Sequence, residues 1–277
     1  MQTTSLPEDL DGGSNAPVQV FHYTSTHNLQ RGKIHLSRHT ISFLRHGTKE
    51  VLGQSQRISI DPQHFLIMQS GRCLMTESIS PDQQLYQSIL LFFTDEILHS
   101  VIQKNAVKTA ESRPLAVFRY DAYIQHFVES LVQISRLEAR FQEKMLPLKC
   151  TEILSYLLQR DGPEVLKSLR HRLDGTERHF INVVEHNRLN KLSLQELAFL
   201  CNMSVSTFKR SFQKHYHASP SKWFQENRLE HAATRLRRHQ LRAIEVFEEA
   251  GYESLSNFVQ AFRRKYGMTP KVWQQQK

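Results

Sequence analysis

The sequence predicts an α+β protein of two domains, in which a β-rich N-terminal domain with a helical hairpin precedes an all-α C-terminal domain. Three observations support this. Short apolar segments separated by Pro, Gly, Asp and Gln follow one another between residues 18 and 95. Apolar residues at helical spacing begin near residue 121, and one stretch of the last third recurs 50 residues later. At 277 residues, the chain is long enough for two separate cores.

Positive charge is concentrated toward the C-terminus. The chain has 36 basic and 27 acidic residues, a formal net charge of +9. Residues 171–277 contain 18 basic and 10 acidic side chains, so they carry an excess of eight, and residues 1–170 carry an excess of one. The C-terminal part therefore needs a specific explanation for its charge.

Several classes of protein are excluded by the sequence. The longest apolar runs, such as residues 89–93, fall far short of the ~20 residues that a membrane span requires. The acidic N-terminus, around residues 8–11, lacks the layout of a secretory signal. Cys73, Cys150 and Cys201 are far apart and form no Cys-x-x-Cys pair, so neither a disulfide framework nor a zinc knuckle is expected. We expect a cytoplasmic protein with no membrane contact.

The N-terminal segments predict a small barrel or sandwich over residues 18–95, after a disordered stretch at residues 1–17. Alternation of apolar and polar residues around residues 41–43, followed by a turn at Gly47, is typical of a strand and its end. The aromatic residues of this segment are either packed core or the lining of a ligand pocket. The candidate lining residues are Phe43, Phe65, Tyr86 and Phe92.

Two helices are predicted after these strands. Residues 121–142 place Phe127, Leu131, Ile134 and Leu137 on one side, and Pro147 begins a second helix that ends before Gly162. Residues 121–160 would form either the contact of a homodimer or a cover for the β domain. The junction at residues 162–175 is expected to contain a short helix at residues 164–172.

The most informative feature is the repeat, in which residues 206–223 recur at 256–273 without a gap. The matched pairs are Phe208 and Phe258, Phe212 and Phe262, Tyr216 and Tyr266, Pro220 and Pro270, and Trp223 and Trp273. Upstream, the same offset matches Leu194 with Ile244, Leu197 with Phe247, and Ser204 with Ser254. Two copies are too few for a solenoid, so the repeat indicates a duplicated unit.

Each copy predicts a short helix, a tight turn and a second, capped helix. Ser193 and Glu196 form a capping box that begins a helix, and Ser204 caps the next one after a turn at residues 201–203. In the second copy, Gly251 ends the first helix and Ser254 caps the second. This arrangement is a helix-turn-helix, present twice.

The two second helices have contrasting faces. The aromatic stripe of each is interpreted as core, whereas the opposite face is polar or basic and has no acidic residue. The residues on these faces are Ser206, Thr207, Lys209, Arg210, Gln213 and Lys214 in the first copy, and Ser256, Asn257, Gln260, Arg263 and Arg264 in the second. They are either a binding surface or merely solvated. A helix of roughly 25 Å from residue 219 to about 238 could hold them about one DNA turn, ~34 Å, apart.

Residues 177–273 resemble the paired helix-turn-helix domain of the AraC/XylS family of bacterial transcription regulators. The motifs behind the resemblance are Leu-x2-Leu-Ala at 194–198, Ser-x-Ser-x-Phe-x-Arg-x-Phe at 204–212, Ser-Pro followed by Trp at 219–223, Arg228-Leu229, and Gly251-Tyr252 before the second stripe. At the 50-residue offset, Ala243 replaces the capping serine, and His217 stands where the family usually has glycine.

The resemblance implies that residues 174–277 are the DNA-binding domain and that residues 18–165 are a cupin-like regulatory or dimerisation barrel. A metal-binding cupin has a His-x-His pair followed by Glu and a later His. The histidines between residues 22 and 64 show no such spacing, so we expect no metal and no cofactor.

The sequence therefore predicts a sequence-specific regulator that inserts two recognition helices into adjacent major-groove segments of double-stranded DNA. The expected base contacts are Ser206, Thr207, Lys209, Arg210, Ser256, Asn257 and Gln260, and the expected phosphate contacts are Gln213, Lys214, Arg263 and Arg264. The resemblance suggests an activator that contacts RNA polymerase and responds to a small-molecule or protein effector.

The sequence is compatible with two other binding functions, and it argues against a catalytic one. The chain could be a ligand-independent regulator controlled by a protein partner through its N-terminal domain, or a protein that binds nucleic acid without specificity. An enzyme is not expected, because the sequence has no phosphate-binding glycine loop and no Gly-x-Ser-x-Gly or His-Glu-x-x-His motif.

Overall fold

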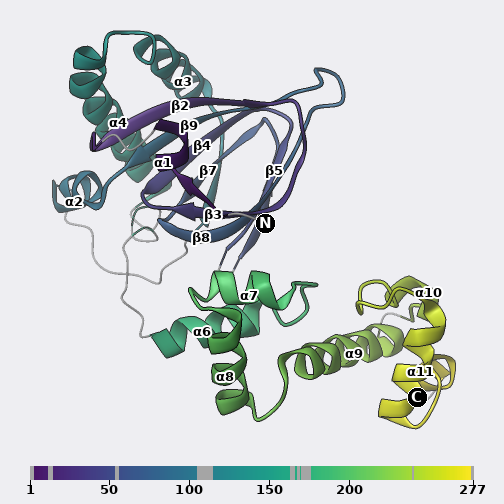
Figure 1. The fold of residues 1–277 in the computed structure, drawn as a ribbon. Coiled ribbons are helices and arrows are strands. Elements are labelled where there is room, and N and C mark those ends of the chain that lie inside the picture. The colour runs from purple at the N-terminus through teal and green to yellow at the C-terminus, as the bar shows by residue number, and fades with distance from the viewer. Residues whose placement is uncertain are drawn as a thin grey trace. The chain divides into compact units, whose positions relative to one another are not determined.

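The computed structural model describes residues 3–11, 15–53, 56–104, 115–162, 166, 169, 176–238 and 240–275. The chain divides into two compact units, Met1–Thr176 and Glu177–Lys277 (Figure 1). Among the described residues, no helix combines the length and the apolar character needed to cross a membrane. The short helix expected at residues 164–172 lies almost wholly outside the described residues.

The first unit contains two five-stranded sheets. In spatial order, the first sheet has β1 (Thr3–Leu6), β3 (Leu29–Leu36), β8 (Gly71–Ser78), β5 (Thr48–Leu52) and β6 (Arg57–Ile60). The second has β10 (Leu115–Arg119), β7 (His64–Met68), β4 (His39–His46), β9 (Tyr86–Phe93) and β2 (Val18–Ser25). The described strands form a sandwich of two sheets, so the closed barrel implied by the resemblance is corrected to a cupin-like sandwich.

The second sheet is buried on both faces, which explains the apolar run at residues 89–93. Leu90 belongs to a cluster between the two sheets, whereas its neighbour Leu91 belongs to a cluster on the opposite face. Successive residues of a strand point to opposite faces, so a strand that is covered twice needs apolar residues at consecutive positions. At the end of β4, Gly47 has φ 86°, and a Cβ there would lie 2.3 Å from the Ser78 carbonyl oxygen, so only glycine fits.

Three helices cover the outer face of the second sheet: α2 (Asp95–Lys104), α3 (Ala122–Ile134) and α4 (Ala139–Asp161) (Figure 1). The expected helix at residues 121–142 is interrupted between α3 and α4, and Leu137 in that turn is 48% exposed rather than buried. The helix expected to begin at Pro147 begins at Ala139 instead. Pro147 is tolerated inside α4 because the carbonyl that loses its hydrogen bond belongs to Glu143, an exposed residue that water can reach.

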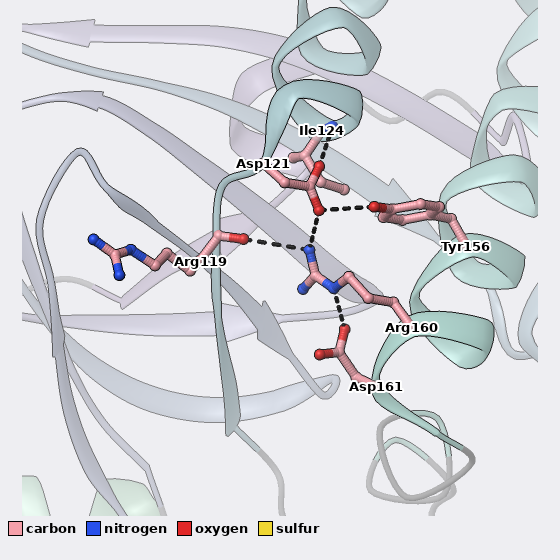
Figure 2. Close-up of polar contacts among 6 residues, drawn as sticks. All are labelled: Arg119, Asp121, Ile124, Tyr156, Arg160 and Asp161. Carbon is pink, nitrogen blue, oxygen red and sulfur yellow. Dashed lines mark hydrogen bonds and ion pairs between the residues drawn. The ribbon is translucent and has the colours of Figure 1, made fainter.

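A polar cluster ties the start of α3 to the end of α4 (Figure 2). An oxygen of the Asp121 carboxylate accepts a hydrogen bond from the Ile124 backbone N–H at 2.8 Å, and the other accepts from the Tyr156 hydroxyl and from Arg160 Nη1, both at 2.7 Å. Burial alone would raise the pKa of Asp121, but these three hydrogen bonds and the charge of Arg160 outweigh it, so the pKa is lowered. The cluster thus closes the helical hairpin.

Residues 3–11 form a strand and a short helix, contrary to the disorder expected for residues 1–17. β1 pairs in parallel with β3, and α1 (Glu8–Asp11) follows it. Leu6 packs against the cluster between the sheets, and its carbonyl oxygen accepts a hydrogen bond from the Ser37 backbone N–H at 3.0 Å. The edge of β3 and the apolar contact of Leu6 order this segment, and neither is visible in the local sequence.

The second unit is entirely helical in its described part. Its helices are α6 (Thr176–His186), α7 (Leu194–Leu200), α8 (Val205–Tyr216), α9 (Pro220–Arg238), α10 (Ala243–Val246), α11 (Leu255–Tyr266) and α12 (Pro270–Gln275). The 19 residues of α9 correspond to about 28 Å at 1.5 Å per residue. This helix separates two helix-turn-helix units, α7 with α8 and α10 with α11.

Candidate nucleic-acid interface

The first helix-turn-helix has the caps that its sequence predicts. The Ser193 backbone N–H donates to Glu196 Oε2 at 2.7 Å, and the Glu196 backbone N–H donates to Ser193 Oγ at 3.2 Å, which completes the capping box of α7. Asn202 takes a left-handed conformation in the turn, with φ 58°. Ser204 Oγ then accepts from the Thr207 backbone N–H at 3.1 Å and starts α8.

The aromatic stripe of α8 is core, as predicted. Phe208 and Phe212 are fully buried, and Phe180 of α6 packs edge-on against both, with ring centroids 5.6 Å and 6.2 Å away. Tyr216 packs on Trp223 of α9 at 4.8 Å between centroids. These contacts fix the rotation of α8 about its axis, so the face opposite the stripe points outward.

The second unit repeats this packing around α11. Phe258 and Phe262 are fully buried, and Tyr266 lies 4.7 Å from Trp273 of α12. The Ser254 hydroxyl accepts from the Asn257 backbone N–H at 3.2 Å. Gly267 ends α11 in the left-handed region, with φ 74°.

The first helix of the second unit has a different register from the one predicted. The residue at the cap position of α10 is Arg242, whose backbone N–H donates to Glu245 Oε2 at 2.7 Å, so Glu245 matches Glu196 at an offset of 49. At this offset, the buried partner of Leu197 is Val246, which is 1% exposed, whereas Ile244 is 57% exposed.

The turn of the second unit accounts for the change of register. Its left-handed residue is Gly251, three residues before the cap Ser254, whereas Asn202 stands two residues before Ser204. One additional residue in this turn restores the offset of 50 for α11. The matches of Ile244 with Leu194 and of Phe247 with Leu197 are therefore wrong, and Ala243 is not the counterpart of the capping serine.

The predicted recognition faces lie at the surface. Ten of the eleven predicted DNA-contacting side chains are exposed, and Thr207 is half-buried. In the described part of the chain, the cationic side chains Lys209, Arg210, Lys214, Arg263 and Arg264 have no carboxylate within ion-pair distance.

Several other cations of the same unit are paired. Lys265 lies 2.9 Å from Glu230, Lys222 lies 3.9 Å from Glu226, and Arg235 also contacts Glu249. The outward faces of α8 and α11 thus keep their positive charge available for a ligand.

Two predicted base contacts are already engaged in the helix cap. The hydroxyls of Ser206 and Thr207 each lie 2.9 Å from Ser204 Oγ. A hydroxyl can both donate and accept, so they retain capacity for a further partner. Lys209 and Arg210 extend further from α8, and no such contact holds them in the described residues.

A brace between α9 and the second turn was missed by sequence reasoning. Arg228 Nε donates to the Ala250 carbonyl at 3.2 Å, and Gln225 Nε2 donates to the Tyr252 hydroxyl at 3.0 Å. A Cβ on Gly251 would lie 3.0 Å from Arg228 Nε. The motif pair Arg228-Leu229 was the available signal, and Arg228 holds the turn after α10 against α9.

The residues proposed for a ligand pocket lie in packed regions. Phe43 and Phe65 are fully buried on the helix-covered face of the second sheet, and Tyr86 and Phe92 are fully buried between the sheets. A cavity of about 230 Å³ between the two sheets is lined by other residues, among them Ile34, Met75 and Leu90.

The described residues offer no centre for thiol or metal chemistry. Burial raises the pKa of Cys73 and Cys201 to about 12, and it raises the pKa of Cys150 as well. No three His, Cys, Asp or Glu side chains of the described part lie close enough together to hold a metal ion.

Comparison with known proteins bears on both units. A helix-turn-helix domain model matches residues 197–276, and an ExsA N-terminal regulatory domain model matches residues 39–169. The virulence regulon transcriptional activator VirF of Yersinia enterocolitica is 28% identical over 224 residues, which cover 78% of this chain and 81% of VirF. Both domains are of the kind found in AraC-type transcription regulators. The protein is a DNA-binding regulator of the helix-turn-helix type.

Two further relatives within this group are regulators. The thermoregulatory protein LcrF of Yersinia pestis is 27% identical and covers 78% of this chain and 81% of its own length. The regulator ExsA of Pseudomonas aeruginosa is 30% identical over 124 residues, 44% of this chain and 45% of ExsA. The solved structure of ToxT from Vibrio cholerae covers 93% of this chain and 98% of its own at 8% identity, with a TM-score of 0.42, and adds nothing to the assignment.

Proposed function

We propose that this protein is a sequence-specific activator of transcription in the bacterial cytoplasm, with α8 and α11 as its recognition helices. The observation that carries the proposal is the set of exposed cations without carboxylate partners on the outward faces of α8 and α11. Lys209, Arg210 and Lys214 on α8 and Arg263 and Arg264 on α11 are exposed and have no carboxylate partner in the described structure, whereas Lys265, which is half-buried on α11, pairs with Glu230. Unpaired cations on a helix narrow enough for the major groove are suited to DNA.

The position of each side chain along its helix suggests its role. Lys209 and Arg210 lie near the start of α8, where a recognition helix approaches base edges, and both side chains suit the O6 and N7 atoms of guanine. Asn257 and Gln260 occupy the same part of α11 and suit the N6 and N7 atoms of adenine.

The smaller polar residues near both helix starts, Ser206, Thr207 and Ser256, complete the proposed base contacts. Gln213, Lys214, Arg263 and Arg264 lie further along their helices, and we assign them to phosphates.

Selection of binding sites from a random DNA pool tests this proposal. The full chain should enrich one bipartite sequence, with two short elements about 10 base pairs apart, because α9 holds one recognition helix at each of its ends. Enrichment of no sequence, with binding that depends on salt alone, would instead support the non-specific alternative.

Activation is supported by the relatives, since VirF is described as a transcriptional activator. We propose that the protein, once bound, contacts RNA polymerase. Transcription with purified polymerase from a promoter that carries the selected site should increase when the protein is added. A decrease would identify a repressor.

The helical hairpin offers a surface for a second copy. Its inner side chains cover the second sheet, but Phe141, Met145 and Leu148 of α4 are 47%, 39% and 65% exposed and share one face by their spacing. We propose a homodimer through residues 121–160, with a regulatory protein partner as the alternative occupant.

Sedimentation velocity tests the homodimer. Phe141→Glu with Leu148→Glu should convert the dimer to a monomer, whereas Ile244→Glu in the second unit, at an equally exposed apolar position, should leave it unchanged. A parent chain that sediments as a monomer would favour the partner-controlled regulator.

A further inference from the structure

The two helix-turn-helix units share α9, and each half of this helix belongs to a different core. Phe224 packs on Phe212 of α8, with ring centroids 5.7 Å apart. From Leu229 onward, the buried side chains of α9 join a second cluster with Phe258 and Phe262 of α11. Among the described residues, this second cluster includes none from α7 or α8. The position of α11 relative to α8 therefore depends largely on α9 between Phe224 and Leu229.

Residues 225–228 form the one turn of α9 between the two cores, which we call the bridging turn. All four side chains are half-buried, whereas Phe224 before them and Leu229 after them are buried. Most of the stability of a helix in a protein comes from packing, so a turn without a buried side chain has little stability of its own. The bridging turn is therefore the part of α9 that would bend most readily.

Two side chains of the bridging turn fasten it to the turn of the second helix-turn-helix. Gln225 Nε2 donates to the Tyr252 hydroxyl at 3.0 Å, and Arg228 Nε donates to the Ala250 carbonyl oxygen at 3.2 Å. The two donors lie three residues apart on α9, so they project from the same side of the helix. Bending of α9 at this turn would break one or both bonds.

A third contact comes from α11 itself. Lys265 Nζ donates to the Glu226 carbonyl oxygen at 3.1 Å and to Glu230 Oε1 at 2.9 Å. A helical carbonyl accepts from the backbone N–H four residues further on, and its second lone pair allows this additional bond. The bridging turn and the second recognition helix are thus joined directly.

A small bend at the bridging turn would change where α11 meets the DNA. Residues 229–238 extend about 15 Å beyond this turn at 1.5 Å per residue. A bend of about 13° would displace their far end by about 3.4 Å, which is the length of one base-pair step. A protein that accepts a single separation between its two DNA elements must therefore hold this turn to within a few degrees.

We propose that Gln225, Arg228 and Lys265 are positioning residues, which hold the bridging turn straight and so set the separation of the two DNA elements that the protein accepts. Their role is geometric, and base contacts are left to α8 and α11. The inference rests on the proposed recognition helices and adds to them a second source of specificity, the spacing of the site.

The distance between the recognition helices, measured on the full chain without DNA, tests the proposal directly. Nitroxide labels can be attached selectively to Gln213→Cys on α8 and Gln260→Cys on α11, because both positions are exposed and the native cysteines are buried. Double electron–electron resonance should give one narrow distance distribution. The combined variant Gln225→Met, Arg228→Met and Lys265→Met removes the three contacts but keeps unbranched side chains, and it should broaden the distribution by about 3 Å, the scale of one base-pair step.

Arg235→Met is the matched control. It also removes a cation of α9 that contacts the second helix-turn-helix, through Glu249, but it lies about two helical turns beyond Arg228. The distance distribution should keep the width of the parent. Arg228→Met alone is the milder test variant and should broaden the distribution by less than the combined variant does.

Binding to sites of altered spacing gives the second measurement. When one base pair is inserted between the two elements of the selected site, or removed, the parent should bind roughly tenfold more weakly, because one element loses its base contacts. The combined variant should lose less than about threefold, and it should retain base discrimination within each element.

Two outcomes would overturn the proposal. One is a combined variant, shown by thermal unfolding to be folded, whose distance distribution and spacing preference match those of the parent. The other is a parent that binds all three separations equally. A parent that selects no DNA sequence would instead refute the proposed function, while the label distances, which need no DNA, would still decide the role of the bridging turn.

Discussion

Replacing Arg210 by alanine should weaken and broaden DNA recognition without affecting the fold. Arg210 is exposed on α8 and has no ion pair or side-chain hydrogen bond in the described structure. Its loss should therefore change the free energy of unfolding by less than about 0.5 kcal/mol. Loss of a bidentate contact with guanine costs about 1–3 kcal/mol of binding, which corresponds to roughly a 5- to 150-fold increase in Kd.

Fluorescence anisotropy on the selected site and on its single-base variants measures this effect. The parent should discriminate strongly at the base pair that Arg210 contacts, and Arg210→Ala should bind all four variants at that position with similar affinity. Lys214→Ala is the matched comparison on the same helix: it should weaken binding to every sequence equally and reduce the slope of log K against log salt by about one. Lys222→Ala, which removes a cation that faces Glu226 on α9, should change little.

Two results would refute the assignment of these side chains. If Arg210→Ala retains the parent's discrimination at every position, Arg210 does not read a base. If Lys214→Ala relaxes one base position, the proposed division between base and phosphate contacts along α8 is reversed.

Three further predictions concern the helix ends and can be measured by unfolding. His217 ends α8 in the left-handed region, with φ 52°, at the position where α11 has Gly267. His217→Gly should relieve the backbone strain there and stabilise the second unit by about 0.5–1 kcal/mol, or several degrees in Tm. A lower Tm would show that His217 is not strained. Ser193→Ala removes the hydroxyl acceptor of the capping box and should lower the free energy of unfolding in urea by about 1 kcal/mol. An unchanged value would show that this cap does not stabilise α7. Asp121→Asn keeps an acceptor for the cap but removes the charge opposite Arg160, and should cost about 1 kcal/mol at pH 7. Because the pKa of Asp121 is lowered in the folded protein, the stabilisation by its carboxylate is complete above about pH 4 and is lost as the pH falls through the folded-state pKa. The free energies of unfolding of parent and variant should therefore converge in acid. A difference that stays constant with pH would exclude the ion pair as the cause.

The features predicted correctly from the sequence depend on neighbours along the chain. The capping box of Ser193 and Glu196 needs only four residues, and the stripe of Phe208 and Phe212 needs only the helical period. The exposure of Arg210 follows from the same period once the buried stripe is known. The recognition faces could therefore be placed on their helices without a structure, while their contacts with DNA remain predictions.

The features that were missed or misplaced depend on contacts between distant segments. β1 is ordered by the edge of β3, and β10 by β7, neither of which leaves a mark in the local sequence. The extra residue between Gly251 and Ser254 changes the offset from 49 to 50, and the gapless segment at 256–273 begins after it, so extending the offset of 50 upstream misplaced the match of α10 by one position. The aromatic residues, for which the sequence allowed either packed core or a pocket lining, are packed, whereas the cavity between the sheets is lined by aliphatic side chains such as Ile34 and Leu90. Packing, rather than composition, decides where a protein interior is left unfilled.

A hydroxyl-radical footprint of the full chain on its selected site tests the central claim most directly. We predict two protected windows in neighbouring turns of one face of the duplex, with one window lost in Arg210→Ala and the other in Gln260→Ala. A single window, or protection that both variants weaken equally, would contradict the claim that α8 and α11 read separate segments of the major groove.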